Sequence, residues 1–470
     1  MIESRSQPDA SEPAERSNEV RSVVDLLSSL INEPAIVDVL GEETALQSRM
    51  VYTRTVTIWL LMLQRLGRSL TLSEVVLQML RFDHGLLPDN KRVRDRTLSR
   101  NNSAYDAARK RLPLQTVLDF SSAVCNYLGE TSEPVFEDRR VFILDGTTIK
   151  LPPTPQLHKA FPPALNQHGE SVWPIAQLAV AHELRSGCAL LPQVDPKYGP
   201  NAVGEVKQCL NIIERLPENA IVMADSNFGI FSVAHACVAA RHDFLFRLTA
   251  QRFNSLCKKA QLCSEEGNIK TYRLSWRPTT IDRRSAPNLD QATALQCYLH
   301  EVPLPNNTLL YLITNLSISG SCAGELYRRR YDVEFDIRDV KVTLDTENIR
   351  AKSVSMVMKE LMCSIVAFNL VAQFRRQAAK LAKVEPRKLS FTDVWRTFRY
   401  DLLYADATSQ EQWQEKYTLA LIHASRCLLP NRKKPRSYPR KAHYRRPKTT
   451  KFYKTLQAQK GSKPPPVELK

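Results

Sequence analysis

The sequence predicts an α/β protein in which a mixed β-sheet is preceded and followed by helical regions. Between about residues 20 and 128, apolar residues recur at the 3.6-residue spacing of amphipathic helices. From about residue 139 to 248 the pattern changes to short β-like runs with helical stretches between the later ones. From residue 322 onward the helical spacing returns. Strands that alternate with helices in the middle of a chain are typical of a sheet flanked by helices.

Composition and length limit the class of protein. A chain of 470 residues predicts two or three domains, and 43% hydrophobic with 24% charged residues is the balance of a folded soluble protein. No stretch approaches the roughly 20 uninterrupted apolar residues that a membrane span requires, so we expect no membrane. Residues 1–19 are polar and acidic, unlike a secretory or transit peptide, and predict a disordered leader. The ten scattered cysteines indicate reduced thiols and a cytoplasmic location.

The first region, residues 20–130, is predicted to be a helical domain that binds nucleic acid. Its periodic runs are VVDLLSSLI, VTIWLLMLQRL, SEVVLQMLRF and LQTVLDFSSAVCNYL. Between the last two lies a basic segment, in which Ser103 can cap a short helix that presents Tyr105 and Arg109 on one side. We expect DNA contacts from this segment; the alternative is a solvated loop and helix face. The expected contact residues are Arg109, Lys110 and Arg111.

The middle region, residues 131–350, is predicted to hold the main sheet. Its expected strands are RRVFIL, WPIAQLAVAHEL, CALLPQV, AIVMA and DFLFRL, with helices at 201–216 and 229–241. This order of strands and helices fits a ribonuclease-H-like core. The further strand-like runs TYRLSWRP, ALQCYLHEV and TLLYLITNL predict a β-rich insertion at about 250–318, before the next helix. A helical C-terminal region follows at 351–430.

The last segment, residues 431–470, is a basic tail. It holds 14 Lys and Arg against the single acid Glu468, which accounts for +13 of the total charge of +17. Such a Pro-interrupted segment cannot bury enough apolar surface to fold alone, but it can neutralise phosphates by releasing counterions. Nucleic acid is the partner we expect, with a tail that only aids solubility as the alternative.

Two aspartates are candidates for metal binding. Asp145 follows the run RRVFIL and is predicted to open a turn, and Asp225 stands in the same relation to AIVMA. Groups at the carboxyl ends of strands line the crevice of an open α/β sheet, so these two carboxylates can face each other across it. Without metal such a pair would repel, whereas with magnesium both become suitable oxygen ligands. Either aspartate alone can equally be an ordinary turn or helix cap.

A polar helical stripe supplies the third carboxylate. Tyr327, Arg330, Glu334 and Lys341 have offsets of 0, 3, 7 and 14. At about 100° per residue these positions fall within about 60° of one another on one helix. The alternative is a solvated face on which Arg330 simply pairs with Glu334.

This stripe resembles the Y-x2-R-x3-E-x6-K signature of the DDE transposases of the insertion-sequence-4 family. DGTTIKLP at 145–152 is similar to the first-aspartate block of that family, ITNL at 313–316 to its strand before the last helix, and RYDVEFDIRDVK at 330–341 to its last-carboxylate block. The resemblance continues through IRAKSVSMVMKEL and HYRRPK, and so covers the chain from about residue 95 onward. One departure is Ser226, which follows Asp225 where the family usually has an arginine.

The resemblance implies a transposase that cleaves and rejoins DNA at terminal inverted repeats. Asp145, Asp225 and Glu334 would hold two Mg²⁺ ions, for which Mn²⁺ can substitute, and Tyr327, Arg330 and Lys341 would hold DNA phosphates. It also implies that the protein acts as a homodimer on double-stranded DNA, both the terminal repeats and the target. The protein would be cytoplasmic, and nucleoid-associated when it is bound to DNA. If a base is flipped out near the cut, Trp276 or Tyr311 is the expected stacking partner.

Two alternatives remain from the sequence. One is a domesticated DNA-binding protein without catalysis, against which the presence of all three carboxylates counts. The other is a ribonuclease-H-like nuclease that cuts without joining.

Overall fold

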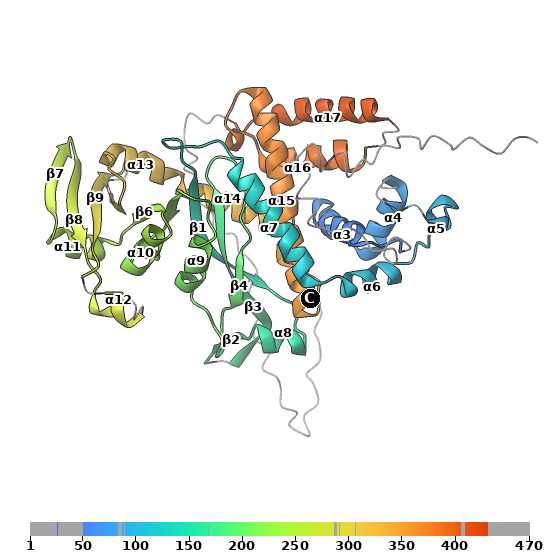
Figure 1. Cartoon of the computed structure of the whole chain (residues 1–470), viewed down its shortest axis with the longest axis horizontal. Helices are drawn as coiled ribbons and strands as arrows, with labels where there is room; N and C mark the ends of the chain where they lie inside the picture. The colour runs from blue at the N-terminus through green and yellow to red at the C-terminus, as the bar shows by residue number, and fades with distance from the viewer. Residues whose placement is uncertain are drawn as a thin grey trace, which may run out of the picture.

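The structure is a computed structural model, and Figure 1 shows the whole chain. The predicted leader, the run VVDLLSSLI apart from Leu26, and the basic tail lie outside the residues that it describes. The described residues are 26, 50–82, 87–88, 90–167, 169–285, 289–290, 292–305, 307–405 and 409–430.

The described N-terminal region consists of helices, whose starts have local sequence causes. Thr53 caps the first of them by accepting a hydrogen bond from the backbone N–H of Val56. Thr71 and Glu74 form a reciprocal capping box at the start of the next, with distances of 2.7 and 3.2 Å. The helices are α3 (Arg54–Leu66), α4 (Leu72–Phe82), α5 (Lys91–Arg94), α6 (Ser103–Arg111) and α7 (Leu114–Glu130).

A ten-stranded mixed sheet forms the centre of the protein, which confirms the expected α/β class. Its order is β2-β3-β1-β5-β6-β10-β9-β8-β7, and β4 pairs with the other side of β3. β1 runs antiparallel to β3 and parallel to β5, which in turn runs parallel to β6; the remaining pairings are antiparallel. The strands are β1 (Val141–Lys150), β2 (Pro163–Asn166), β3 (Gly169–Glu183), β4 (Gln193–Pro196), β5 (Ile221–Ala224), β6 (Asp243–Arg247), β7 (Gln261–Glu266), β8 (Ile269–Trp276), β9 (Leu295–Pro303) and β10 (Leu309–Thr314).

The β-rich segment before the last-carboxylate helix extends this sheet and does not form a separate one. Leu312 of β10 pairs with Arg247 of β6, and β9, β8 and β7 continue outward from β10. Figure 1 shows these strands at the end of the molecule farthest from α4 and α5. Two short helices, α11 (Ala250–Cys257) and α12 (Thr280–Ser285), accompany them. The segment is therefore a lateral continuation of the sheet past β6.

Helices cover both faces of the sheet because β1 and β5 alternate their apolar side chains between two cores. Phe142 and Val222 face one core, to which α9 (Glu205–Ile213) and α10 (Phe231–Ala239) contribute. Ile143 and Met223 face the other core, which contains most of α15 (Val354–Ala382). Strands that are buried on both faces read as continuous apolar runs, and this is why RRVFIL and AIVMA were recognisable.

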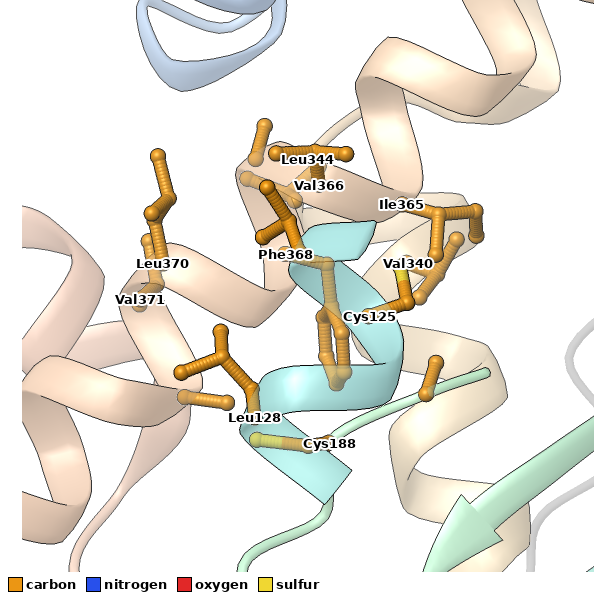
Figure 2. Packing of buried hydrophobic residues seen from close by; sticks show 14 of the residues in the cluster. Cys125, Leu128, Cys188, Val340, Leu344, Ile365, Val366, Phe368, Leu370 and Val371 are labelled. Atoms are coloured by element: carbon orange, nitrogen blue, oxygen red, sulfur yellow. The ribbon is translucent and has the colours of Figure 1, made fainter. Parts of the chain in front are cut away.

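Helix α15 is the central helix of the second core. Figure 2 shows its Phe368 close to Cys125 and Leu128 of α7, and both helices contribute to one apolar cluster. By length and composition alone α15 could cross a membrane, but 78% of its most apolar window is buried inside the protein. It is therefore a core helix. Beyond it lie α16 (Phe391–Thr397) and α17 (Gln410–Ser425), and α8 (Pro155–Ala160) follows β1.

A buried histidine makes the stability of the β8–β9 pair depend on pH. His300 of β9 is fully buried. Its Nδ1 lies 3.0 Å from the hydroxyl of Thr271, and its Nε2 has no hydrogen-bond partner among the residues that the structure describes. Burial lowers the pKa of His300 from 6.5 to about 4. Below about pH 6.5 the unfolded chain therefore binds a proton that the folded chain does not. The free energy of unfolding thus decreases as the pH is lowered from about 6.5 to about 4.

We expect this one group to cost about 2 kcal/mol of unfolding free energy at pH 5 relative to neutral pH. The measurement is urea unfolding at both pH values for the wild type and for His300→Leu, which cannot titrate. The variant should lose less stability on acidification than the wild type. An equal loss in both proteins would show that His300 is not the titrating group.

Candidate active site

Asp145 lies in the middle of β1, not at its end. β1 continues to Lys150, and its antiparallel pairing with β3 runs without interruption from Phe142 to Lys150. The prediction that Asp145 opens a turn is therefore wrong. The physical reason is that the β-branched Thr147, Thr148 and Ile149 favour an extended backbone, which overrides the turn preference of the Asp-Gly pair.

Asp225 stands level with Asp145 on the neighbouring strand. The parallel register pairs Val141 with Ile221 and Ile143 with Met223, a constant offset that places residue 145 beside residue 225. Asp225 comes directly after β5, as predicted, and its Oδ1 accepts a hydrogen bond of 2.8 Å from the backbone N–H of Asn227. The strand register thus brings the two aspartates together at the point where β5 stops.

Glu334 belongs to a helical segment that changes its pitch along the way. The segment consists of α13 (Gly320–Arg328), a 3₁₀ turn, α14 (Asp332–Arg338) and a π-helical turn (Asp339–Thr343). The expected single regular helix is therefore incorrect in detail, because a π turn and a 3₁₀ turn rotate the side chains away from ideal α-helical phase. α14 packs against β1 all the same.

The other three members of the stripe all face the sheet edge that carries the aspartates. The hydroxyl of Tyr327 donates a hydrogen bond of 3.3 Å to the carbonyl of Ala224, the residue before Asp225. The ammonium of Lys341 lies 3.1 Å from the carbonyl of Thr148 on β1. Tyr327, Arg330 and Lys341 thus pack toward the sheet, whereas Glu334 is exposed and pairs with Arg330, as the alternative of a salt-bridged face expected.

Arg330 connects two of the carboxylates. Its Nη2 donates a 2.6 Å hydrogen bond to Oε1 of Glu334, and its Nη1 lies 3.5 Å from Oδ2 of Asp145. The Arg330 side chain is only 10% exposed, whereas that of Glu334 is 54% exposed. A largely buried guanidinium therefore stands between an inner carboxylate and an outer one.

The surroundings of Asp145 disfavour its charged form, and a bound cation would stabilise that form. Burial raises the pKa of Asp145 above its usual range, and the nearby charges of Asp225 and Glu334 raise it further. A hydrogen bond of 2.7 Å from the backbone N–H of Gly146 and the charge of Arg330 act in the opposite direction. The environment thus favours a positive charge next to Asp145, and Arg330 supplies part of it.

The chemistry of these donors fits a hard divalent cation. Carboxylate oxygens are the ligands that magnesium prefers, and Asp145 has an Oδ2 that faces the guanidinium instead of the backbone. Within the described ranges, no three His, Cys, Asp or Glu side chains are grouped closely enough to hold a metal ion as they stand. Arg330 lies between Asp145 and Glu334 in this arrangement, so metal binding requires these side chains to move toward one another.

The structure changes the assignment of the predicted N-terminal DNA contacts. Arg109 is 7% exposed, and its guanidinium is bonded to the buried Glu360 of α15, so its predicted DNA contact is corrected to a structural role. Tyr105 on the same helix face is fully buried. Lys110 and Arg111 are exposed, and Lys110 pairs with Asp106 of the same helix at 2.6 Å. Only these two remain available to a ligand from that group.

The two predicted base-stacking aromatics are also packed against the protein. Trp276 is 5% exposed and makes an edge-to-face contact with Phe231. Tyr311 stacks on Phe253 with ring centroids 4.4 Å apart. Trp276 is therefore part of the core, which corrects this expectation, whereas Tyr311 is half-buried with one ring face on Phe253.

Two kinds of residue near the site escaped the sequence interpretation. Arg252 of α11 donates a 2.6 Å hydrogen bond to the carbonyl of Ser226, so a guanidinium reaches the turn after Asp225 from another helix. Tyr331 and Phe335 flank Glu334 and are 52% and 54% exposed. Arg330 stacks on the first ring at 4.7 Å and Arg338 on the second at 5.1 Å. Their only sequence signal was the run of aromatic and basic residues around Glu334.

Comparison with known proteins identifies the class that this fold and site define. Residues 136–370 match the model of the family described as "Transposase DDE domain", which is half of the chain. The matched region includes β1, β5 and α14, and with them all three carboxylates. The chain belongs to the DDE transposase domain family, and the resemblance noted in the sequence is confirmed. Membership implies a general dependence on divalent metal ions.

The chain is also similar to individual transposases. The chain is 22% identical over 299 residues to the transposase InsG of insertion sequence element IS4 from Escherichia coli strain K12. The alignment covers 62% of this chain and 65% of that relative, slightly less than two thirds of its length. A cryo-electron microscopy structure of a piggyBac transposase synaptic complex with hairpin DNA aligns with a TM-score of 0.41 at 10% identity, covering 91% of this chain and 89% of its own.

Proposed function

We propose that the protein catalyses cut-and-paste DNA transposition, by metal-dependent phosphodiester hydrolysis and strand transfer at terminal inverted repeats. The observation that carries this proposal is the position of Arg330. Its guanidinium contacts both Asp145 on β1 and Glu334 on α14, and Asp225 stands level with Asp145 on the next strand. We infer that three acids distant in the sequence come together where β5 ends beside the middle of β1.

We also propose that the centre of the sheet is a ribonuclease-H-like core. β4, β3 and β1 form an antiparallel unit, and β5 and β6 add to β1 in parallel. The first aspartate lies within β1 and the second directly after β5. This order is the support for the assignment, and the β-rich segment at about 250–318 is an addition to it beyond β6.

Asp145, Asp225 and Glu334 would hold two Mg²⁺ ions, with Mn²⁺ as a substitute, and Asp145 would be shared between them. When bound, such a pair of ions activates the attacking oxygen and neutralises charge on the attacking and leaving oxygens. Arg330 provides positive charge to Asp145 and Glu334, and its planar fork of donors also suits a phosphate.

Lys341 and Tyr327 place further groups around the same edge. The Lys341 ammonium is anchored on the carbonyl of Thr148 and paired with Glu347 at 3.2 Å, so its charge is held close to β1. Tyr327 is buried, and its bond to Ala224 fixes α13 against the end of β5. We infer that Lys341 holds a DNA phosphate. Tyr327 was also expected to hold a phosphate, but it is 3% exposed, so we infer instead that it positions the segment carrying Glu334.

The proposed partners are double-stranded DNA, both as terminal repeat and as target, and a second copy of the chain on that DNA. The net charge of +13 on residues 431–470 supports a sequence-independent contribution to DNA binding. We propose that the protein acts in the cytoplasm and associates with the nucleoid through this binding. The exposed rings of Tyr331 and Phe335 replace Trp276 and Tyr311 as candidates for stacking on an unpaired base.

The proposal is tested by supplying the purified protein with Mg²⁺ and a labelled terminal inverted repeat taken from the DNA that flanks its gene. We expect cleavage at the element end and joining to a target duplex. Glu334→Gln should bind the repeat with unchanged affinity but not cut it, because the amide cannot serve as an anionic metal ligand. Glu325→Gln, which removes an exposed carboxylate from α13 of the same segment, is the matched control.

Three outcomes separate the alternatives. Cleavage without joining would identify a nuclease, and DNA binding without any cleavage would identify a non-catalytic DNA-binding protein. Equal cutting by the wild type and Glu334→Gln would remove Glu334 from the active site.

A further inference from the structure

A cavity lined by several charged side chains lies between the N-terminal helices and the start of α15, outside the carboxylate site. It has a volume of about 830 Å³, within the range of ligand-binding pockets. Five cationic side chains and two carboxylates line it, for a net charge of +3. The cations are Arg65, Arg109, Lys110, Arg350 and Lys352, and the carboxylates are Asp106 and Glu360.

The two carboxylates are already neutralised within the protein, and two of the cations are not. Glu360 is paired with both Arg65 and Arg109, and Asp106 is paired with Lys110 at 2.6 Å. Arg350 and Lys352 are exposed at the surface of the cavity. Neither has an acidic oxygen within 4 Å among the ion pairs found in the described part of the chain. Of the net charge of +3, +2 therefore belongs to these two residues, and +1 belongs to the group formed by Glu360 with its two arginines.

The backbone adds donors to the same space. The first residues of α4, α6 and α15 all contribute to the lining, so the positive ends of three helix dipoles converge there. At the start of α6 the side chain of Asn102 makes no capping hydrogen bond, but Oδ1 of Asn101 accepts a 2.9 Å hydrogen bond from the backbone N–H of Ser103. In addition, the Nε of Arg109, on a side chain buried for more than nine tenths, has no hydrogen-bond partner among the described residues.

The lining indicates which part of an anionic ligand is recognised. It contains no Phe, Tyr, Trp or His, and so offers no ring for a base to stack on. Its polar groups are cations, hydroxyls and amides, which suit phosphate oxygens. The cavity is thus built for a phosphate group, without a means of reading bases.

The cavity is connected to the catalytic strand through short contacts. The backbone carbonyl of Lys352 accepts a 3.0 Å hydrogen bond from the hydroxyl of Thr154, the residue that caps α8 just after β1. Arg350 and Lys352 lie in the loop that leaves the π turn carrying Lys341. In Figure 1, α4 and α6 lie on the side of α15 away from the strands β7–β9. A DNA strand held at the cavity would therefore approach β1 from the side of the N-terminal helices.

We propose that this cavity binds phosphodiester groups of the DNA backbone, through Arg350 and Lys352, as a contact separate from the carboxylate site. The proposal rests on the proposed function, since it takes DNA as the ligand. The test measures binding of the full chain to a labelled duplex of random sequence, without divalent metal, over KCl from about 50 to 200 mM. The variants are Arg350→Gln, Lys352→Gln and the double variant. The double variant Lys258→Gln/Lys259→Gln, which removes two exposed charges beyond α11, is the matched control.

We expect the double cavity variant to bind about tenfold more weakly at the middle of this salt range, with a salt slope reduced by about 1.8, and the control to change by less than about twofold. Wild-type affinity and slope in the cavity variant, or an equal loss in the control, would overturn the proposal. If inorganic phosphate alone raises the melting temperature of the wild type but not of the cavity variant, while DNA binding is unchanged, the site holds free phosphate and the DNA assignment is refuted. Cleavage is measured separately with Mg²⁺: a wild type that binds but never cuts refutes the proposed function and leaves the binding comparison intact.

Discussion

Replacing Asp145 by asparagine should lower the rate of metal-dependent DNA cleavage roughly 10³-fold or more, since several kcal/mol of charge stabilisation depend on this ligand. Asparagine keeps the shape of the side chain and can still accept the hydrogen bond from the backbone N–H of Gly146. It removes the one carboxylate that Arg330 and both other acids surround. The measurement is the single-turnover rate of terminal-repeat cleavage in Mg²⁺.

Binding and folding of this variant provide the internal controls. DNA affinity without metal should be unchanged, and the urea midpoint should not fall, because burial and the neighbouring acids already disfavour the Asp145 charge. Asp119→Asn, at an exposed position of α7, is the matched control and should cut at the wild-type rate. An Asp145→Asn protein that cuts within a few-fold of wild type would exclude Asp145 as a metal ligand.

Replacing Glu360 by glutamine should destabilise the protein by about 3–5 kcal/mol, the typical cost of leaving buried charges without their partner. Glu360 lies on α15 and is 6% exposed; its two oxygens are bonded to Arg65 of α3, at 2.9 Å, and to Arg109 of α6. The substitution keeps the volume of the side chain and leaves two buried guanidinium groups without a negative charge.

Urea unfolding measures this loss, and the exposed Glu415→Gln on α17 serves as the control. Because Glu360 joins both N-terminal helices to the central helix, the variant should also expose sites in α3 and α6 to protease before sites in the sheet. A loss below about 1 kcal/mol would mean that this triad contributes no more than a surface ion pair.

The order of elements was largely predictable, because strands buried on both faces have no polar interruptions. The runs that became β3, β5 and β6 were each recognised within a few residues, whereas β1 continues six residues beyond the expected end at Leu144. β7 was missed, since all of its residues are exposed and its sequence QLCSEE has no apolar alternation. The join between β10 and β6 is a long-range pairing, for which local spacing holds no information.

The sequence was enough to propose the three carboxylates as candidates, but not to predict the local structure around them. Asp-Gly after an apolar run suggests a turn, and only the pairing of β1 with β3 shows that the strand continues through Asp145. Arg109 was misassigned although a signal existed: Tyr105, Ala108 and Leu112 share its side of α6, and such an apolar face turns inward. The partner that makes a buried arginine possible, Glu360, is remote in the sequence and was not identifiable from it.

The central claim is that Asp145, Asp225 and Glu334 together hold divalent metal against a DNA phosphate. Its most direct test is anomalous diffraction at the manganese edge from crystals of the protein with Mn²⁺ and a terminal-repeat duplex. We predict two manganese peaks, both within about 2.0–2.6 Å of Asp145 oxygens, one also bound by Asp225 and the other by Glu334, with Arg330 no longer between the carboxylates. Manganese bound elsewhere, or absent from these carboxylates while DNA occupies the site, would contradict the account.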